Sequence, residues 1–498
     1  MSVRIYPVTR TCLECDDYTV KINGEKLDLD TARVSAYPFN RRWPGHQRQI
    51  EQTELVNFLS LAVDGQIEVE IIPKHEFEGV KIRPETLDLK AEITQSSIKF
   101  VLDKPAYFTV EPYGRHNALH ILADPMPEYN LTDGNEVIYF GKGEHEVGIL
   151  ELKSNQTVFI DEGAIVYASI YAYEAQNIKI LGRGILDNSH NKEKILFEVN
   201  AENNPFDAGN SERLPTVWFQ YCTDIEIDGI TIRDSLVYNI SPVACKRISI
   251  KNIKIIGCWR YNSDGIDMLN CEDVEISDCF VRTYDDAICV KGFDSYREED
   301  GMYHNGQSYD LSKNITVSNC TIWNDWGKCL EIGAETRARE MSDIVFKNCN
   351  IIHVTGPAMD CLSVDYADIH NVLYENIHIE YDDVIPCPLI QNTDEEVYAE
   401  GEQEYAPPLI CMDIMFHPEY SADKIRRGIS RDFTFRDIYL SGRHTPKIHI
   451  AGYDDKHKCS NILISDLYWN GKKLSDLPKD SIDCNEFCEN IYFNKKEI

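Results

Sequence analysis

The chain has 498 residues, of which 43% are hydrophobic and 27% are charged, a composition typical of a globular protein with a large core. The formal net charge of −33 repels polyanions, so nucleic acid and anionic membrane surfaces are poor partners. No apolar run approaches the roughly 20 residues that a membrane helix needs.

The cysteines and the N-terminal sequence predict a cytoplasmic protein. The first residues lack the apolar segment of a secretory signal. Most of the 17 cysteines lie in alternating apolar segments, where a thiol acts as a small hydrophobe. We therefore expect no disulfide among Cys279, Cys320 and Cys349. Cys12 and Cys15 form one C-x-x-C, but no second pair completes a zinc site, so we predict no metal and no cofactor.

Residues 1–130 predict a small N-terminal β-sandwich domain. They contain GQIEVEIIP, VKIRPETLDLKAEI and SSIKFVLDKPAYFTVE, in which apolar and polar residues alternate between Gly, Pro and Asp turns. Such alternation is typical of antiparallel strands with one buried face.

Residues 131–498 contain a recurring pattern: a polar residue, apolar-x-apolar, a polar turn with Asn, Asp or Gly, and apolar-x-apolar again. It is found as NIKILGRGI at 177, DIEIDGITI at 224, RISIKNIKI at 247, DVEISDCFV at 273, NITVSNCTI at 314, DIVFKNCNI at 343, NVLYENIHI at 371, DFTFRDIYL at 432 and NILISDLYW at 461. The close repeats are 23 to 29 residues apart, and the longer intervals leave room for inserted loops.

This repeat favours an all-β fold built as a parallel β-helix. The intervals are too short for propeller blades, and the fixed leucines of a leucine-rich repeat are absent. A β-sandwich with accidental periodicity is the alternative. If the repeats are coils, Ile227, Ile250, Ile276, Val317 and Phe346 form one inward stack.

Three aspartates stand in two short segments that flank one repeat. Asp264 lies in NSDGIDM, whereas Asp285 and Asp286 lie in YDDAICV, 21 residues further on and about one coil away. Equivalent positions on neighbouring coils are about 4.8 Å apart, so the segments should form one acidic site. Glycoside hydrolysis needs such carboxylates, a calcium site uses them too, and a solvated acidic face is the third interpretation. The flanking apolar strand residues favour catalysis.

These motifs resemble those of the family 28 glycoside hydrolases, the polygalacturonases. NSDGID and DDAICVKG resemble the paired acidic motifs of that family, and ILGRGILDNS and RDSLVYNISPVACKRISIKNIKI resemble its preceding coils, over roughly residues 136–380. An N-terminal region before a β-helix is also similar to the dextranase and isopullulanase family. The resemblance implies a right-handed β-helix that hydrolyses glycosidic bonds with inversion. It makes Asp285 the general acid and gives activation of the attacking water to Asp264 and Asp286.

The sequence departs from the polygalacturonase pattern at two places. The Gly-His-Gly motif is replaced by WGKCLEIGAE, which puts Lys328 where histidine is expected. The Arg-Ile-Lys motif that holds the uronate carboxylate is replaced by GPAMDCLSVDYAD, which adds Asp360 and Asp365 instead of cations. We therefore expect a neutral or singly charged oligosaccharide rather than long homogalacturonan.

Six further residues beside the acidic motifs are candidates for binding this substrate. Polar side chains can bind sugar hydroxyls, aromatic rings can stack on sugar faces, and each can equally serve as an ion pair, a solvated charge or part of the core. The candidates are Asn262, Lys291, Lys328, Glu331, Tyr261 and Trp326.

Other functions remain compatible with this reading of the sequence. A neutral α-glucan or glycoside hydrolase of the dextranase type needs the same acids. A uronate lyase or epimerase would need Lys328 or Lys291 as the base. A non-catalytic carbohydrate-binding solenoid has no need of clustered aspartates. The oligomeric state cannot be predicted.

Overall fold

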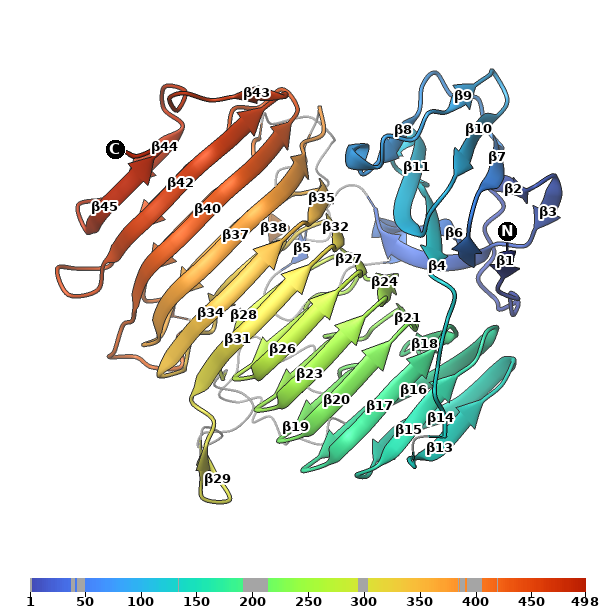
Figure 1. Cartoon of the computed structure of the whole chain (residues 1–498), viewed down its shortest axis with the longest axis horizontal. Coiled ribbons are helices and arrows are strands. Elements are labelled where there is room, and N and C mark those ends of the chain that lie inside the picture. The colour runs from blue at the N-terminus through green and yellow to red at the C-terminus, as the bar shows by residue number, and fades with distance from the viewer. Residues whose placement is uncertain are drawn as a thin grey trace.

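The computed structural model describes residues 2–36, 41–42, 50–132, 134–190, 214–293, 303–383, 385, 390–391, 405–418 and 420–498. Nearly all regular structure in them is β-strand, with two 3₁₀ turns, η1 (Ile50–Gln52) and η2 (Glu85–Leu87). A small pair of sheets from the N-terminal part lies beside a long β-helix (Figure 1). No helix among these residues is long and apolar enough to cross a membrane.

The N-terminal part forms two sheets that enclose one apolar core. The larger sheet contains β1 (Ser2–Ile5), β4 (Asp30–Ser35), β6 (Thr53–Asp64), β8 (Lys81–Arg83), β11 (Ala106–Arg115) and β12 (Leu119–Asp124). The smaller contains β2 (Tyr18–Ile22), β3 (Glu25–Leu27), β7 (Ile67–Pro73), β9 (Glu92–Ile93) and β10 (Ile98–Leu102). Both sheets contribute to the same buried cluster, as expected for a sandwich. Pairing is antiparallel except between β6 and β12, which run parallel.

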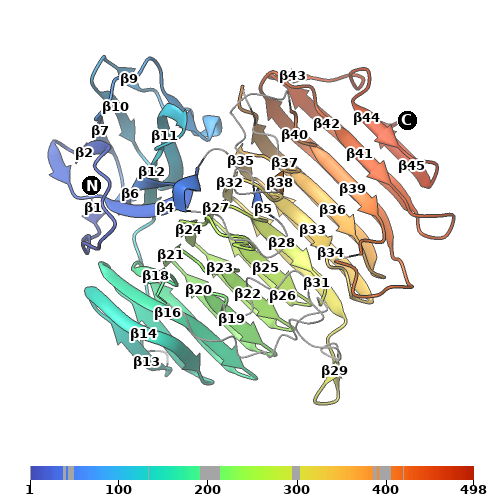
Figure 2. The same cartoon turned by 180° about the vertical axis from the view of Figure 1, so that it is seen from behind.

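From residue 136 onward the chain forms a right-handed parallel β-helix with three faces (Figures 1 and 2). The first face contains β13 (Glu136–Phe140), β15 (Gln156–Ile160), β17 (Gln176–Gly182), β20 (Thr223–Asp228), β23 (Lys246–Lys251), β26 (Glu272–Ser277), β31 (Leu311–Ser318), β34 (Glu340–Lys347), β37 (Asp368–Glu380), β40 (Ile429–Ser441), β42 (Cys459–Trp469) and β45 (Cys488–Phe493).

The other two faces follow in every coil. β14 (Gly143–Leu152) and β16 (Ala164–Tyr173) run along both of them. The second face continues with β18 (Ile185–Asp187), β21 (Thr231–Arg233), β24 (Lys254–Ile256), β27 (Phe280–Thr283), β32 (Thr321–Asn324) and β35 (Asn350–His353). The third continues with β19 (Val217–Gln220), β22 (Ile240–Val243), β25 (Ile266–Leu269), β28 (Ile288–Lys291), β33 (Leu330–Ala334), β36 (Met359–Ser363), β39 (Ile410–Ile414), β41 (Ile448–Ala451) and β44 (Ile482–Cys484).

The predicted inward stack is confirmed. Register pairs Ile227 with Ile250, Ile250 with Ile276, Ile276 with Val317 and Val317 with Phe346, and all five side chains are buried in one core cluster. The predicted all-β helix is therefore correct, because each repeat contributes one residue to the same interior column.

The polar residues of the repeat have a backbone function. The residue that opens the repeat and the one at its turn have positive φ, as at Asn314 and Asn319, both at 56°. Asn and Asp tolerate this left-handed conformation better than other non-glycine residues. Their side chains also bond from coil to coil: Asn319 Nδ2 donates to Asp278 Oδ1 at 3.2 Å and Asn314 Nδ2 to Asp273 Oδ1 at 2.7 Å.

The coil cysteines are free thiols. Cys279, Cys320 and Cys349 are buried without disulfide bonds, as expected. They follow the turn residues on successive coils, and burial contributes to a raised pKa of the Cys349 thiol, after its hydrogen bond with Cys320. A thiol fits this corner because it is small and apolar.

The N-terminal sheets pack on the outer side of the second face. A buried cluster joins Val34 of β4, Phe58 of β6 and Leu122 of β12 to Phe280 of β27 and Trp323 of β32. Buried ion pairs flank these apolar contacts. This attachment fixes the N-terminal sheets beside the turns that lead from the second face to the third (Figure 2).

The C-terminal end of the β-helix is covered by two hairpin strands. β43 (Lys472–Lys473) runs antiparallel to the end of β42, and β46 (Lys496–Glu497) runs antiparallel to β45. Elsewhere, β29 (Tyr303–His304) and β30 (Gln307–Ser308) form a separate hairpin, and β5 (Arg41–Arg42) pairs in parallel with β38 (Ile390–Gln391).

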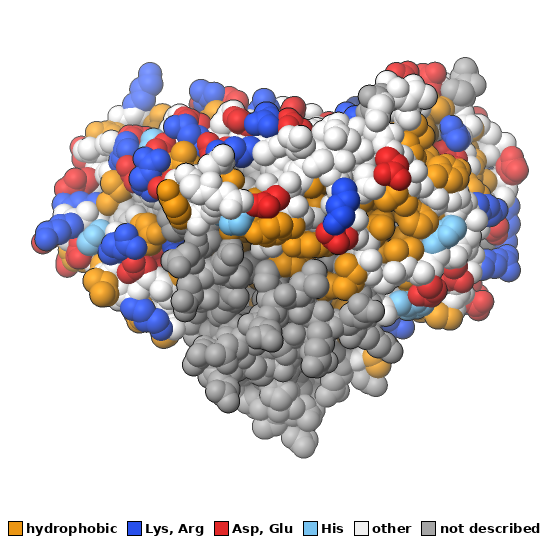
Figure 3. All heavy atoms as spheres, turned by 90° about the horizontal axis from the view of Figure 1, so that it is seen from below, with side chains coloured by type: hydrophobic (Ala, Val, Ile, Leu, Met, Phe, Trp, Pro, Cys, Tyr) orange, Lys and Arg blue, Asp and Glu red, His pale blue; other side chains and the backbone are white. Residues whose placement is uncertain are grey.

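Charged side chains are mixed on the described surface. On the face seen from below, Lys and Arg side chains are interspersed with Asp and Glu side chains, and hydrophobic side chains gather between them (Figure 3).

Candidate active site

The three aspartates lie in two successive turns between the second and third faces. Asp264 precedes β25, and Asp285 and Asp286 precede β28. Because β25 and β28 pair Ile266 with Ile288, Asp264 and Asp286 occupy equivalent positions on neighbouring coils. The structure thus brings together the two segments that the sequence places 21 residues apart.

Glycines allow these turns to stack closely. A Cβ on Gly265 would lie 2.2 Å from the carbonyl oxygen of Ala287, and one on Gly327 would lie 2.5 Å from Oδ1 of Asp286. Both distances are too short for any side chain. The close approach lets the backbone N–H of Lys328 donate to Asp286 Oδ1 at 3.0 Å.

Lys291, at the end of β28, lies among carboxylates from three successive coils. Its Nζ lies 2.9 Å from Asp264 Oδ2, 3.6 Å from Asp267 Oδ2, 3.7 Å from Asp286 Oδ2 and 4.0 Å from Glu335 Oε2. The Lys291 side chain is buried. Burial alone would lower the pKa of Lys291, but the surrounding carboxylates, Asp264 first, raise it well above its ordinary value.

Lys328, one coil further, forms the other side of this cluster. Its Nζ lies 3.0 Å from Glu331 Oε1 and 3.5 Å from Asp286 Oδ1. Unlike Lys291, it is a quarter exposed, whereas Glu331 is fully buried. Asp286 is therefore held between two lysines, one from its own coil and one from the next.

Asp285 is the more exposed member of the acid pair. Its carboxylate accepts hydrogen bonds from the backbone N–H of Asn262, at 3.2 Å to Oδ2, and from that of Asp286, at 3.2 Å to Oδ1. Asn262 itself has a φ of 53°, which turns its N–H toward the neighbouring coil. Asn262 thus contacts Asp285, the candidate acid, with its backbone N–H.

The electrostatic environment separates the ionisation of two aspartates. Burial raises the pKa of Asp264 well above its ordinary value, Asp267, Asp285 and Asp286 raise it further, and Lys291 opposes the change. For Asp286, burial acts in the same direction, but Lys328 and Lys291 outweigh it and hold the pKa below its ordinary value. The pKa values of these two aspartates are therefore moved in opposite directions.

Two further acids, Glu331 and Asp360, lie on the third face in the two coils that follow Asp286. Register pairs Glu331 of β33 with Asp360 of β36. Burial raises the pKa of Asp360 to about 7 and that of Glu331 well above its ordinary value. Asp286, Glu331 and Cys289 have ligand atoms within 4.8 Å of one another, a spacing that could surround a cation. The ammonium of Lys328 already contacts two of these three groups, so we assign this position to the lysine.

The two aromatic candidates differ. Trp326 is half-buried, and its ring stacks on Tyr284 with centroids 6.1 Å apart, which leaves part of the indole exposed beside the site. Tyr261 is only 2% exposed. This burial favours the interpretation of Tyr261 as part of the core, and its role in binding substrate stays a prediction.

Sequence reasoning missed three residues of this region. Asp267 is the last residue of NSDGID and follows Asp264 by three residues. It pairs in register with Cys289, on the outer side of the third face, and this register is the signal that could have found it. Asn324 and Asp325 lie at the turn before Lys328. Asn324 Nδ2 donates to the Asp285 carbonyl oxygen at 2.6 Å, a contact that no sequence spacing indicates.

The model of the family described as "Glycosyl hydrolases family 28" matches residues 142–405, more than half of the chain. The chain belongs to family 28. The segment that matches the family 28 model includes all three aspartates.

The curated relatives of this family 28 chain are polygalacturonases of plants and fungi. A probable polygalacturonase of Vitis vinifera is 25% identical over 230 residues, which cover 41% of this chain and 45% of the relative. A polygalacturonase of Gossypium barbadense is 26% identical over 231 residues, 43% of this chain and 53% of the relative. The chain thus spans about half the length of the curated relatives it matches.

Two solved structures have a similar fold. Dex49A from Penicillium minioluteum superposes with a TM-score of 0.54 at 14% identity, over 99% of this chain and 92% of Dex49A. A hyperthermoactive exopolygalacturonase from Thermotoga maritima gives 0.51 at 19% identity, over 73% of this chain and 85% of that one. At these identities the likeness concerns the fold. The first match includes the N-terminal sheets as well as the β-helix.

Proposed function

We propose that this family 28 enzyme hydrolyses a glycosidic bond of an oligosaccharide with inversion. Asp285 protonates the leaving oxygen, and Asp264 and Asp286 hold and activate the attacking water. The observation that carries the proposal is the stacking of Asp264 and Asp286 on neighbouring coils around Lys291, with Asp285 next to Asp286 and hydrogen-bonded to the Asn262 N–H. An inverting site keeps acid and base far enough apart for water to fit between base and sugar.

The opposite pKa shifts of Asp264 and Asp286 support part of this mechanism. Asp286, with its lowered pKa, is the ionised carboxylate that accepts a proton from water. The raised pKa belongs to Asp264, not to the carboxyl to which the family resemblance assigns proton donation. This observation favours Asp264 as a second candidate for the proton donor.

Leaving-group dependence separates the two candidates for the acid. General acid catalysis contributes typically 10²–10⁴-fold, so we expect kcat of Asp285→Asn to fall by about that factor on an oligosaccharide. A nitrophenyl glycoside needs little protonation, and its hydrolysis should fall much less. Asp286→Asn should slow both substrates alike, because both require water attack.

The result for Asp264→Asn completes the test. If Asp264 holds the water, its variant slows both substrates equally. If Asp264→Asn shows the leaving-group dependence and Asp285→Asn does not, Asp264 is the donor. NMR of the first-formed sugar should show the inverted anomer, and a retained configuration would contradict the mechanism.

We propose that the preferred substrate is neutral or carries one charge. Both site lysines are ion-paired with carboxylates of the chain, namely Lys291 with Asp264 and Lys328 with Glu331. A uronate carboxylate would have to compete with these partners inside a cluster of acids. Asp360, whose pKa burial raises to about 7, can instead exchange hydrogen bonds with sugar hydroxyls when it is protonated.

Reducing-sugar release from matched polymers tests this substrate preference. We expect faster cleavage of neutral oligosaccharides, such as isomalto-oligosaccharides, than of polygalacturonate of equal length. The curated relatives are named polygalacturonases, so polygalacturonate is the appropriate competitor. Efficient cleavage of polygalacturonate that is abolished in Lys328→Ala would show that Lys328 binds the uronate and would overturn the preference.

A further inference from the structure

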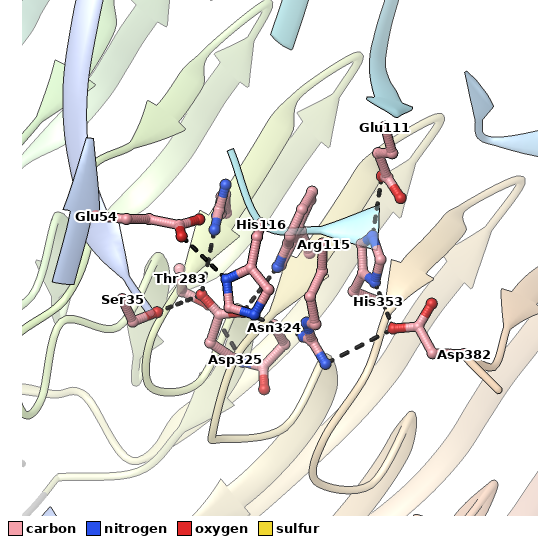
Figure 4. Close-up of polar contacts among 12 residues, drawn as sticks. Ser35, Glu54, Glu111, Arg115, His116, Thr283, Asn324, Asp325, His353 and Asp382 are labelled. Carbon is pink, nitrogen blue, oxygen red and sulfur yellow. Dashed lines mark hydrogen bonds and ion pairs between the residues drawn. The ribbon is translucent and has the colours of Figure 1, made fainter. Parts of the chain in front are cut away.

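Two residues of the N-terminal sheets contact a turn of the active site. Ser35, the last residue of β4, donates a hydrogen bond from its hydroxyl to Asp325 Oδ2. Arg115, the last residue of β11, lies with Nη2 3.2 Å from Asp325 Oδ1. Trp323 Nε1 donates to the same Oδ1 at 2.7 Å. Figure 4 shows Ser35 and Arg115 approaching Asp325 from the N-terminal side. Asp325 is fully buried by these contacts.

Asp325 lies in the turn that contacts Asp285 and Asp286. Its neighbour Asn324 donates from Nδ2 to the Asp285 carbonyl oxygen at 2.6 Å, and Asp325 N–H itself donates to the Thr283 carbonyl oxygen at 3.0 Å. Three residues after Asp325, Lys328 contacts Asp286 through its backbone N–H. Asp285 and Asp286 therefore receive contacts from both ends of the turn that Asp325 anchors.

We propose that Ser35 and Arg115 are positioning residues of the active site, which place the Asn324–Lys328 turn against the acid pair by holding Asp325. The N-terminal sheets are thus a part of the catalytic scaffold. This inference rests on the proposed roles of Asp285 and Asp286.

The contacts to Asp325 are additional to those that attach the N-terminal sheets. Lys254 of β24 lies with Nζ 3.0 Å from both carboxylate oxygens of Asp124 in β12. Thr86 donates from Oγ1 to Asn350 Oδ1 at 2.7 Å. These two contacts and the buried apolar cluster join the same sheets to the second face without involving Asp325. They provide matched controls, one ion pair and one hydroxyl hydrogen bond.

The experiment compares four variants of the full-length chain. Ser35→Ala and Arg115→Met remove the contacts to Asp325, whereas Thr86→Val and Lys254→Met remove equivalent contacts elsewhere in the interface. Steady-state kinetics use an isomalto-oligosaccharide or an oligogalacturonate, whichever the wild type cleaves faster. A misplacement of catalytic groups by about 1 Å can cost 10²-fold, so we expect kcat to fall about 10- to 100-fold in the first pair, with KM changed less than about threefold.

The pH profile of kcat/KM distinguishes a positioning role from a role in attachment, because attachment of the N-terminal sheets alone should not change it. Loosening the turn weakens the hold of Lys328 on Asp286, so a higher pH is needed to ionise Asp286. The acid limb of kcat/KM should therefore move to higher pH in Ser35→Ala and Arg115→Met. Arg115→Lys, which keeps the charge, should recover part of kcat. Thr86→Val and Lys254→Met should lower the unfolding midpoint and leave kcat and the pH profile unchanged.

Each outcome decides between the two proposals. Unchanged kcat in folded Ser35→Ala, with Asp285→Asn inactive, overturns the positioning role and leaves the proposed function intact. An equal loss in Thr86→Val also overturns it, because the effect would then be general to the interface. Full activity of Asp285→Asn overturns the proposed role of Asp285, on which this inference rests. If Arg115→Met does not fold, Ser35→Ala alone still decides, since it removes a single hydroxyl.

Discussion

Replacing Lys328 with methionine tests how the site keeps one aspartate ionised. The Lys328 ammonium lies 3.5 Å from Asp286 Oδ1. With an effective dielectric constant of about 20, two unit charges at that distance attract by about 5 kcal/mol. Because a quarter of the Lys328 side chain is exposed, solvent screens part of this attraction. If about one third of the attraction remains after screening, its loss raises the pKa of Asp286 by about one unit.

The expected result is a displaced pH profile. Asp286 must be ionised to accept a proton from water, and without Lys328 its pKa rises. The acid limb of kcat/KM should therefore move to higher pH by about one unit or more in Lys328→Met. Lys328→Arg retains the charge and should keep the limb near that of the wild type.

Initial rates of product formation between pH 3 and 8 would determine the acid limb of kcat/KM. Near-UV circular dichroism would establish that the variant is folded. An acid limb that stays in place in folded Lys328→Met would refute the reasoning. Either Lys291 alone, at 3.7 Å, would then keep Asp286 ionised, or Asp286 would not be the base.

Three predictions concern stability, each measured by urea unfolding. Burial raises the pKa of Asp360 to about 7, so its protonation stabilises the fold fully below pH 4 and this stabilisation is lost as the pH rises through about 7. The free energy of unfolding of Asp360→Asn should therefore gain a few kcal/mol over that of the wild type between pH 4 and pH 8. The same difference between the two proteins at pH 4 and at pH 8 would contradict this. Phe346→Ala opens the inward stack between Val317 and Tyr374 and should cost about 3–5 kcal/mol, against less than about 1.5 kcal/mol for Phe346→Leu if that variant repacks. Asn319→Ala forces alanine to a φ of 56° and should cost about 1–2 kcal/mol, with Asn319→Gly less harmful. Equal costs of the two variants would show that the lost hydrogen bond to Asp278, and not the backbone conformation, dominates.

The sequence predicted the β-helix because its repeat carries two separate physical signals. Alternating residues such as Ile276 and Val317 must face the interior, and Asp278 and Asn319 must adopt the left-handed conformation at the corner. Both requirements recur in every coil, so they are visible as a pattern. The division at residue 130 into two domains stays a prediction, and so does the cytoplasmic location.

The candidate site was predictable only where it is local or periodic. Asp264 and Asp286 could be brought together because one coil separates them. The burial of Tyr261 and the hold of Ser35 on Asp325 could not be predicted, because both depend on packing between distant segments. The same is true of the ionisation states, since the raised pKa of Asp264 follows from burial that the sequence does not show.

The two hairpin strands at the C-terminus bear on the behaviour of the molecule at high concentration. A stack of parallel coils has no intrinsic last member, and an uncovered final strand offers its N–H and C=O groups to the first strand of another copy. β46 reverses direction against β45, and β43 does so against the part of β42 that extends beyond β45. Their exposed Lys472, Lys473, Lys496 and Glu497 add charge at that edge. The two hairpins thereby cover an edge of the β-helix that would favour growth into fibres if it were open.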